Sequence, residues 1–167
     1  MRIPWKGVGI AGLVIIGAIQ FVRPNRTNPP VDPSHGIQAH MAVPDKVTAI
    51  FQRACRDCHT NETVWPWYSQ IAPVSWILAN DVREGRSFLN LSEWSRYTPA
   101  RSRAKLDQIC ENVSSGKMPL ASYRPFHPDA RLSKDDVRTL CEWTRQAIDA
   151  QLAPAAGKGD SAPAPKP

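Results

Sequence analysis

The chain lacks the signatures of several common protein classes. It contains no Ser-His-Asp set, paired-carboxylate motif, P-loop or dinucleotide fingerprint, which disfavours an enzyme that works without a prosthetic group. Lysines and arginines are scattered, and no known nucleic-acid motif accompanies the net charge of +6, so we expect no nucleic-acid partner. No run of alternating apolar and polar residues predicts a strand. Cysteine is scarce as well, at 4 of 167 residues.

Two of these cysteines lie in one short motif. Cys55, Cys58 and His59 form a C-x-x-C-H sequence, the attachment signature of c-type haem, in which two thiols add to the haem vinyl groups and the imidazole reaches the iron. A zinc site would need a second ligand pair at similar spacing, and Cys110 and Cys141 do not supply one. A thioredoxin-type redox pair would lack the histidine that follows and would lie in a βαβ context, which is absent here. The motif predicts one covalent haem c, with His59 as the proximal iron ligand.

The opposite face of the iron has two candidate ligands. Met118 follows Gly116 and precedes Pro119, so it lies on a loop that can present a thioether; the alternative role is a core methionine. His127 is the rival ligand, because imidazole also suits iron, although a loop histidine can instead bond the backbone or a haem propionate. Methionine ligation would give a higher reduction potential than a second histidine.

The N-terminal segment is apolar. Residues 7–22 contain no charge and would span about 24 Å as a helix, somewhat short of the ~30 Å hydrocarbon core. We expect residues 1–22 to form an uncleaved signal anchor and transmembrane helix. A cleaved signal peptide is the alternative, but no clear A-x-A site follows. Because c-type haem is attached outside the cytoplasm, the rest of the chain should face the periplasmic side of the inner membrane.

The remainder divides into three parts. Residues 23–44 are rich in proline and predict an extended periplasmic linker. Residues 45–151 predict an all-α haem-binding domain, with helices over 45–55, 74–88 and 101–115 and a short turn near 92–94. Ser133 and Asp136 resemble a capping box that opens another helix. Residues 152–167 are rich in alanine and proline, and we expect them to be disordered.

Aromatic residues and the remaining cysteines suggest further roles. The candidates for walling a haem pocket are Trp65, Trp67, Tyr68, Trp76 and Tyr123. Ordinary core packing is the alternative for these side chains, and both roles hold if the haem is part of the core.

Cys110 and Cys141 lie on the apolar faces of two expected helices. An oxidising compartment favours a disulfide between them, and two buried free thiols are the alternative.

The chain resembles a known group of proteins. The segments that match are CRDCHTNET from 55, WPWY from 65, APVSW from 72, GR at 85–86, LNLSEW from 89, MP at 118–119 and YRPFHPDARLS from 123. Together they resemble the bacterial haem-binding domain family over about residues 20 to 150. The resemblance implies a small, N-terminally anchored, cytochrome c-like fold, with haem c at Cys55 and Cys58 and iron on His59. The Gly-x-Met-Pro pattern resembles the distal loop of single-haem cytochromes c, which implies Met118 as a ligand.

Three functions remain open. The leading hypothesis is a membrane-anchored electron carrier rather than an enzyme, with iron cycling between Fe(III) and Fe(II) and with periplasmic or membrane redox proteins as partners. A haem sensor or peroxidase-like enzyme would need an open distal site, with His127 or Tyr123 as a polar group. An accessory haem subunit of a larger redox complex is the third.

Overall fold

The computed structural model describes residues 5–152, and within this range the fold is all-helical with no strand. The α-helices are α1 (Trp5–Ile19), α2 (Ile37–His40), α3 (Asp45–Ala54), α4 (Arg56–His59), α5 (Val74–Phe88), α6 (Pro99–Ser114) and α7 (Lys134–Leu152). Short 3-10 turns are η1 (Pro33–His35), η2 (Trp67–Gln70), η3 (Leu91–Arg96) and η4 (Pro128–Ala130). The expected all-α fold is therefore confirmed. Apart from Leu152, the tail expected to be disordered lies outside the described residues.

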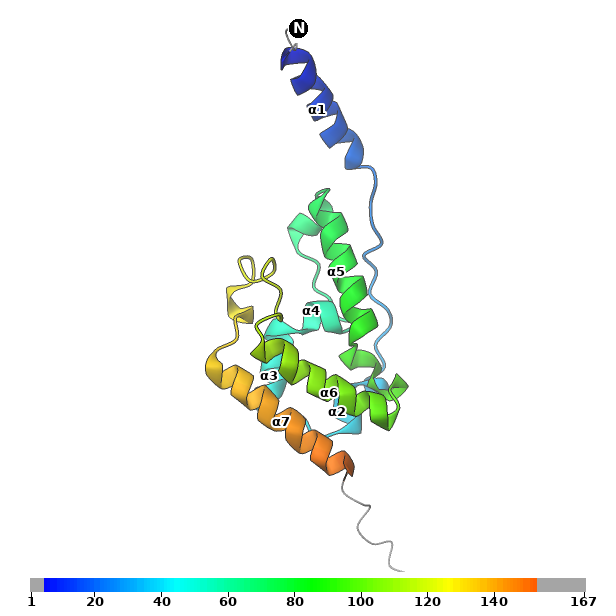
Figure 1. Cartoon of the computed structure of the whole chain (residues 1–167). Coiled ribbons are helices and arrows are strands. Elements are labelled where there is room, and N and C mark those ends of the chain that lie inside the picture. Colours follow the sequence, from blue (N-terminus) through cyan, green and yellow to red (C-terminus); the bar gives the residue numbers. More distant parts are fainter. Residues whose placement is uncertain (1–4, 153–167) are drawn as a thin grey trace, which may run out of the picture.

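Helix α1 stands away from the helical body (Figure 1) and has no buried residue. Its last turn is followed by Gln20, whose side-chain amide accepts from the Ala72 N–H at 2.9 Å and donates to the Ala72 carbonyl at 3.1 Å. The helix is 15 residues long. In the part of the chain that the structure describes, no helix combines the length and apolarity that a membrane crossing requires. The transmembrane helix expected over residues 1–22 is thus not supported.

The segment 23–44 lies against the domain instead of projecting from it as a free spacer. Its elements η1 and α2 contact η3. Ile37 is only 1% exposed and belongs to the hydrophobic core. The Trp143 indole N–H on α7 donates to the Ala42 carbonyl at 3.0 Å. One apolar side chain and several hydrogen bonds therefore make this proline-rich segment part of the folded body.

The core lies where α3, α6 and α7 pack together. Val47, Phe51, Leu106 and Leu140 are among its buried members, and Phe51 meets Trp143 edge-on with ring centroids 5.4 Å apart. These positions repeat at helical spacing, so each helix turns one apolar face inward. The loop that follows α6 leads from this core towards α4 and α5.

The ends of these helices follow from their sequence. Ser133 and Asp136 form the expected capping box: the Asp136 carboxylate accepts from the Ser133 N–H at 2.8 Å, and the Ser133 hydroxyl accepts from the Asp136 N–H at 3.1 Å. After α6, Gly116 has a φ of +71°, the left-handed conformation that glycine adopts most readily. Cys110 on α6 and Cys141 on α7 form a disulfide across a sequence separation of 31.

Candidate functional site

A large hollow lies between α4, α5 and the loop that follows α6. It is a cavity of ≈ 660 Å³, within the range of about 300–1,000 Å³ typical of small-molecule and cofactor sites. Its apolar lining includes Val74, Ile77, Leu78, Phe88, Leu120 and Phe126. Carboxylates of Asp57, Asp81 and Glu84 also line the cavity. The apolar part of the wall suits a large flat apolar group.

His59, the last residue of α4, lines this cavity, and two backbone carbonyls hold one of its ring nitrogens. The side chain is 8% exposed, and its Nδ1 lies 3.1 Å from the Gly85 carbonyl oxygen and 3.0 Å from that of Leu89. Because carbonyl oxygens only accept, Nδ1 carries the proton and Nε2 keeps its lone pair. Burial lowers the pKa of His59, although the two carbonyls oppose this effect. A neutral imidazole with an oriented Nε2 is the form that binds a metal.

Gly85 lets helix α5 approach α4 closely. A Cβ atom at this position would lie 2.5 Å from the Cys58 carbonyl oxygen and 3.0 Å from the Cys58 Cβ. Only glycine therefore allows the Gly85 carbonyl to reach the His59 ring. The Gly85-Arg86 pair was part of the family resemblance, but the sequence analysis assigned it no role. A glycine in the middle of a predicted helix was the available signal, because it can indicate a close approach of two backbones.

The two motif cysteines precede His59, and each lines a hollow that His59 also lines. Cys58 lines the large cavity, and Cys55 lines a smaller hollow of ≈ 50 Å³ that also has His59 in its wall. Both are free thiols. Burial raises the pKa of each thiol to about 12. Electrostatic repulsion adds to this effect, from Cys58 at Cys55 and from Asp57 at Cys58. In the absence of a reacting group both sulfurs are therefore protonated at neutral pH.

Met118 lies in the wall of both hollows. Its position is fixed by the turn after α6, because the Met118 N–H donates to the Asn112 carbonyl at 3.1 Å. The structure thus brings Met118 to the same cavity as Cys58 and His59, although it is far from them in the sequence.

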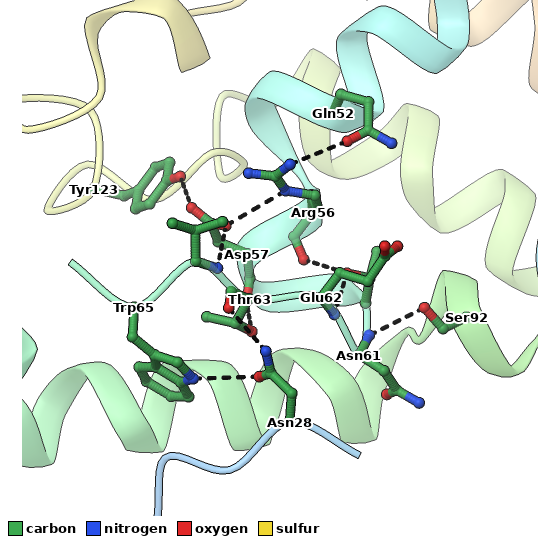
Figure 2. A network of polar contacts seen from close by, with 12 residues as sticks. Asn28, Gln52, Arg56, Asp57, Asn61, Glu62, Thr63, Trp65, Ser92 and Tyr123 are labelled. Atoms are coloured by element: carbon green, nitrogen blue, oxygen red, sulfur yellow. Dashed lines mark hydrogen bonds and ion pairs between the residues drawn. The ribbon is translucent and has the colours of Figure 1, made fainter. Parts of the chain in front are cut away.

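The two candidate tyrosines also line the cavity, and His127 pairs with them beside it. The Tyr123 hydroxyl donates to the Asp57 carboxylate at 2.7 Å (Figure 2), and the Tyr68 hydroxyl lies 2.8 Å from His127 Nε2. The His127 ring stacks on Tyr123 with a centroid separation of 3.9 Å. His127 is not among the cavity-lining residues. One of its ring nitrogens, Nε2, is already paired with the Tyr68 hydroxyl.

The three candidate tryptophans do not line the cavity. The Trp65 indole N–H donates to the Asn28 side chain at 3.2 Å (Figure 2), and that of Trp76 donates to the Val22 carbonyl at 2.7 Å. Trp67 is 75% exposed. An indole N–H requires an acceptor, and here the N-terminal segment supplies it. Trp65 and Trp76 therefore hold that segment on the domain.

Arg86 fixes the loop that follows the motif, a role that sequence reasoning did not assign. Its guanidinium donates to the Thr60 carbonyl at 2.8 Å, to the Thr63 hydroxyl at 2.8 Å and to the Asn28 side chain at 2.7 Å. Thr63 in turn donates to the Asp57 carbonyl (Figure 2). This network joins α5, the motif and the N-terminal segment, and so supports the geometry around Cys58 and His59.

These residues together fit a haem. An apolar cavity of cofactor size has an oriented imidazole, the free Cys58 thiol and a thioether in its walls, and the free Cys55 thiol lines the hollow beside it. Within residues 5–152, no group of three or more His, Cys, Asp or Glu side chains is placed to hold a metal ion on its own.

Comparison with known proteins agrees with this geometry. The haem-binding domain family matches residues 14–146. No curated protein and no solved structure shows a significant match. Since the family match covers most of the 167 residues, the chain belongs to the haem-binding domain family.

Proposed function

We propose that this haem-binding protein is a single-haem c-type cytochrome that transfers electrons. The observation that best supports this function is the placement of Cys58, His59 and Met118 around one apolar cavity, with Cys55 adjoining it. In the proposed holoprotein Cys55 and Cys58 would hold the haem through thioether bonds, and His59 Nε2 and Met118 Sδ would bind its iron.

The chain's residues hold this arrangement rigid. The Gly85 and Leu89 carbonyls keep the proton on His59 Nδ1 and fix the plane of the imidazole. Fixed ligands would limit the rearrangement that accompanies a change of oxidation state. The bound haem supplies reversible Fe(III)/Fe(II) exchange, and a methionine ligand raises its potential. Redox proteins of the periplasm or membrane are the proposed partners.

We further propose that the N-terminal segment anchors the domain to the periplasmic side of the inner membrane. Residues 7–22 carry no charge, and large apolar side chains of α1 face outward, as in Leu13 at 71% exposure. An exposed apolar helix is stable in contact with lipid or another apolar surface. The Cys110–Cys141 disulfide also favours an oxidising compartment.

A second candidate function is a haem-based sensor or a peroxidase-like enzyme. Its support is the pair of phenol side chains, Tyr68 and Tyr123, in the cavity wall. A polar hydroxyl near an open iron position would interact with a bound diatomic or peroxide. This function requires Met118 to leave the sixth position free.

Absorption spectra of the oxidised, reduced and carbon monoxide-treated protein distinguish the two functions. The electron carrier is expected to be six-coordinate and to bind carbon monoxide poorly, and Met118→Ala should open the site. Met41→Ala is the matched control, because Met41 packs against the core but does not line the cavity. Ready carbon monoxide binding by the unaltered protein, with no spectral effect of Met118→Ala, would contradict the proposal.

Two further measurements test attachment and anchoring. Haem should remain with the polypeptide after denaturing extraction, and it should be lost when Cys55 and Cys58 are both replaced by alanine. The full chain should sediment with membranes after an alkaline wash, whereas a chain without residues 1–22 should not. Equal sedimentation of the two chains would refute anchoring without affecting the haem assignment.

A further inference from the structure

A second cavity lies behind the loop that carries Met118. It has a volume of ≈ 460 Å³, and it shares Met118 and Pro119 with the large cavity as part of its wall. Two basic residues, Arg124 and Arg131, line it, and no acidic residue does. The Met118–Pro119 segment therefore separates the apolar cavity from a cavity whose lining is positively charged.

None of the ion pairs within residues 5–152 involves Arg124 or Arg131. The Asp136 carboxylate is bound by Arg53 at 2.7 Å and by Ser133 at 2.8 Å. Across the same residues, the side-chain hydrogen bonds also include none from the guanidinium of Arg124 or Arg131. Both cations are thus free to bind an anion.

The backbone around Arg131 is held in place. The Arg53 guanidinium donates to the Asp129 carbonyl at 2.6 Å and to the Arg131 carbonyl at 3.2 Å. The segment that presents Arg131 is therefore tied to α3, the helix that leads into the C-x-x-C-H motif. A fixed backbone lowers the entropy cost of ordering a ligand-binding side chain.

We propose that the cavity behind Met118 is a carboxylate-binding site, with Arg124 and Arg131 as its cationic pair. Two guanidinium groups at one cavity repel each other, and a carboxylate between them replaces this repulsion with charge-assisted hydrogen bonds. Guanidinium is also the side chain whose planar donors match a carboxylate. The carboxylate comes either from a small organic acid in solution or from a propionate of the protein's own haem.

Binding at this site would act on the wall that contains Met118. A free carboxylate that orders this wall would change how readily Met118 is presented to the large cavity. This coupling rests on the proposed Met118 ligation, whereas the binding itself does not. A calorimetric titration therefore tests the site even if Met118 is not an iron ligand.

The experiment compares three full-length holoproteins: the unaltered chain, Arg124→Gln combined with Arg131→Gln, and Arg138→Gln. Arg138 is the control because it lies on α7, pairs with Asp135 at 3.0 Å, and does not line the cavity. Each protein is titrated with succinate by calorimetry, and its reduction potential is measured as a function of pH.

Two results support the proposal and identify the source of the carboxylate. A free acid is the ligand if succinate binds one-to-one and its affinity falls at least about tenfold in the double variant. The affinity of Arg138→Gln for succinate should then equal that of the unaltered chain. A propionate is the ligand if succinate does not bind and the double variant alone alters the pH dependence of the potential. The proposal is overturned if succinate binding and the pH dependence are the same in all three proteins.

Discussion

Replacing Gly85 with alanine tests the close contact between α4 and α5. Alanine normally stabilises a helix interior by about 0.5–1 kcal/mol relative to glycine. At Gly85 the added Cβ would lie 2.5 Å from the Cys58 carbonyl oxygen, about 0.9 Å closer than the 3.4 Å at which ordinary contact begins. The obstructing atom belongs to the backbone, so no side-chain rotation removes the clash. We therefore expect the sign of the usual effect to reverse.

The magnitude follows from the cost of forcing two helices apart. Overpacking a well-packed contact costs about 1–3 kcal/mol, which outweighs the propensity gain in all but the mildest case. After the propensity gain is subtracted, the net loss of up to about 2.5 kcal/mol corresponds to a fall in Tm of up to about 10 °C for a chain of this length. The movement also lengthens the 3.1 Å contact between the Gly85 carbonyl and His59 Nδ1, so the absorption spectrum of the haem should change as well.

The assay is thermal unfolding of the holoprotein followed by circular dichroism, with the haem spectrum recorded on the same sample. Gly12→Ala is the matched control, since no atom lies within 4 Å of a Cβ at that helical glycine, and its Tm should not fall. A Gly85→Ala protein that is as stable as the unaltered chain and has the same spectrum would refute the reasoning.

Two further changes test features outside the cavity. Replacing Cys110 and Cys141 with serine opens a link across 31 residues, and this should lower the free energy of unfolding in urea by about 3–4 kcal/mol while the haem spectrum stays the same. In Asp136, burial raises the carboxyl pKa, but hydrogen bonds from Arg53 and Ser133 outweigh it, so the pKa lies below its usual value. The stabilisation is then present above the unfolded-state pKa of about 4 and is lost as pH falls through the lower folded-state pKa. Asp136→Asn should therefore reduce stability at pH 7 by up to about 1 kcal/mol and have little effect at pH 2, whereas Asp135→Asn, in an exposed ion pair, should have little effect at either pH.

Local patterns predicted the helices well. The apolar spacing over residues 74–88 gave the bounds of α5, Val74–Phe88, and the Ser133–Asp136 pair marked the start of α7. These features depend on neighbours within one or two turns, and such neighbours can be read from the sequence. Residues 23–44 were harder, because their proline content indicated a spacer, while the packing of Ile37 into the core depends on residues far along the chain.

The site was predictable only in part, for the same reason. The C-x-x-C-H motif is local, so Cys58 and His59 were found together, and the structure places both at one cavity. The tryptophans that follow the motif looked like pocket walls, yet Trp65 and Trp76 bond the N-terminal segment. Residue type alone does not reveal which acceptor an indole N–H will find in the folded chain.

The orientation of His59 shows what the motif leaves undetermined. The ring is held by carbonyls 26 and 30 residues away in sequence, at the C-terminal end of α5, where the Gly85 carbonyl also accepts from the Leu89 N–H at 2.8 Å. The imidazole N–H donates to these carbonyls, and the negative end of the helix dipole makes the ring a stronger electron donor through Nε2. The motif thus supplies the ligand, but the end of α5 sets its direction and basicity. Changes at Gly85 should therefore affect the haem as much as changes within the motif's own intervening residues.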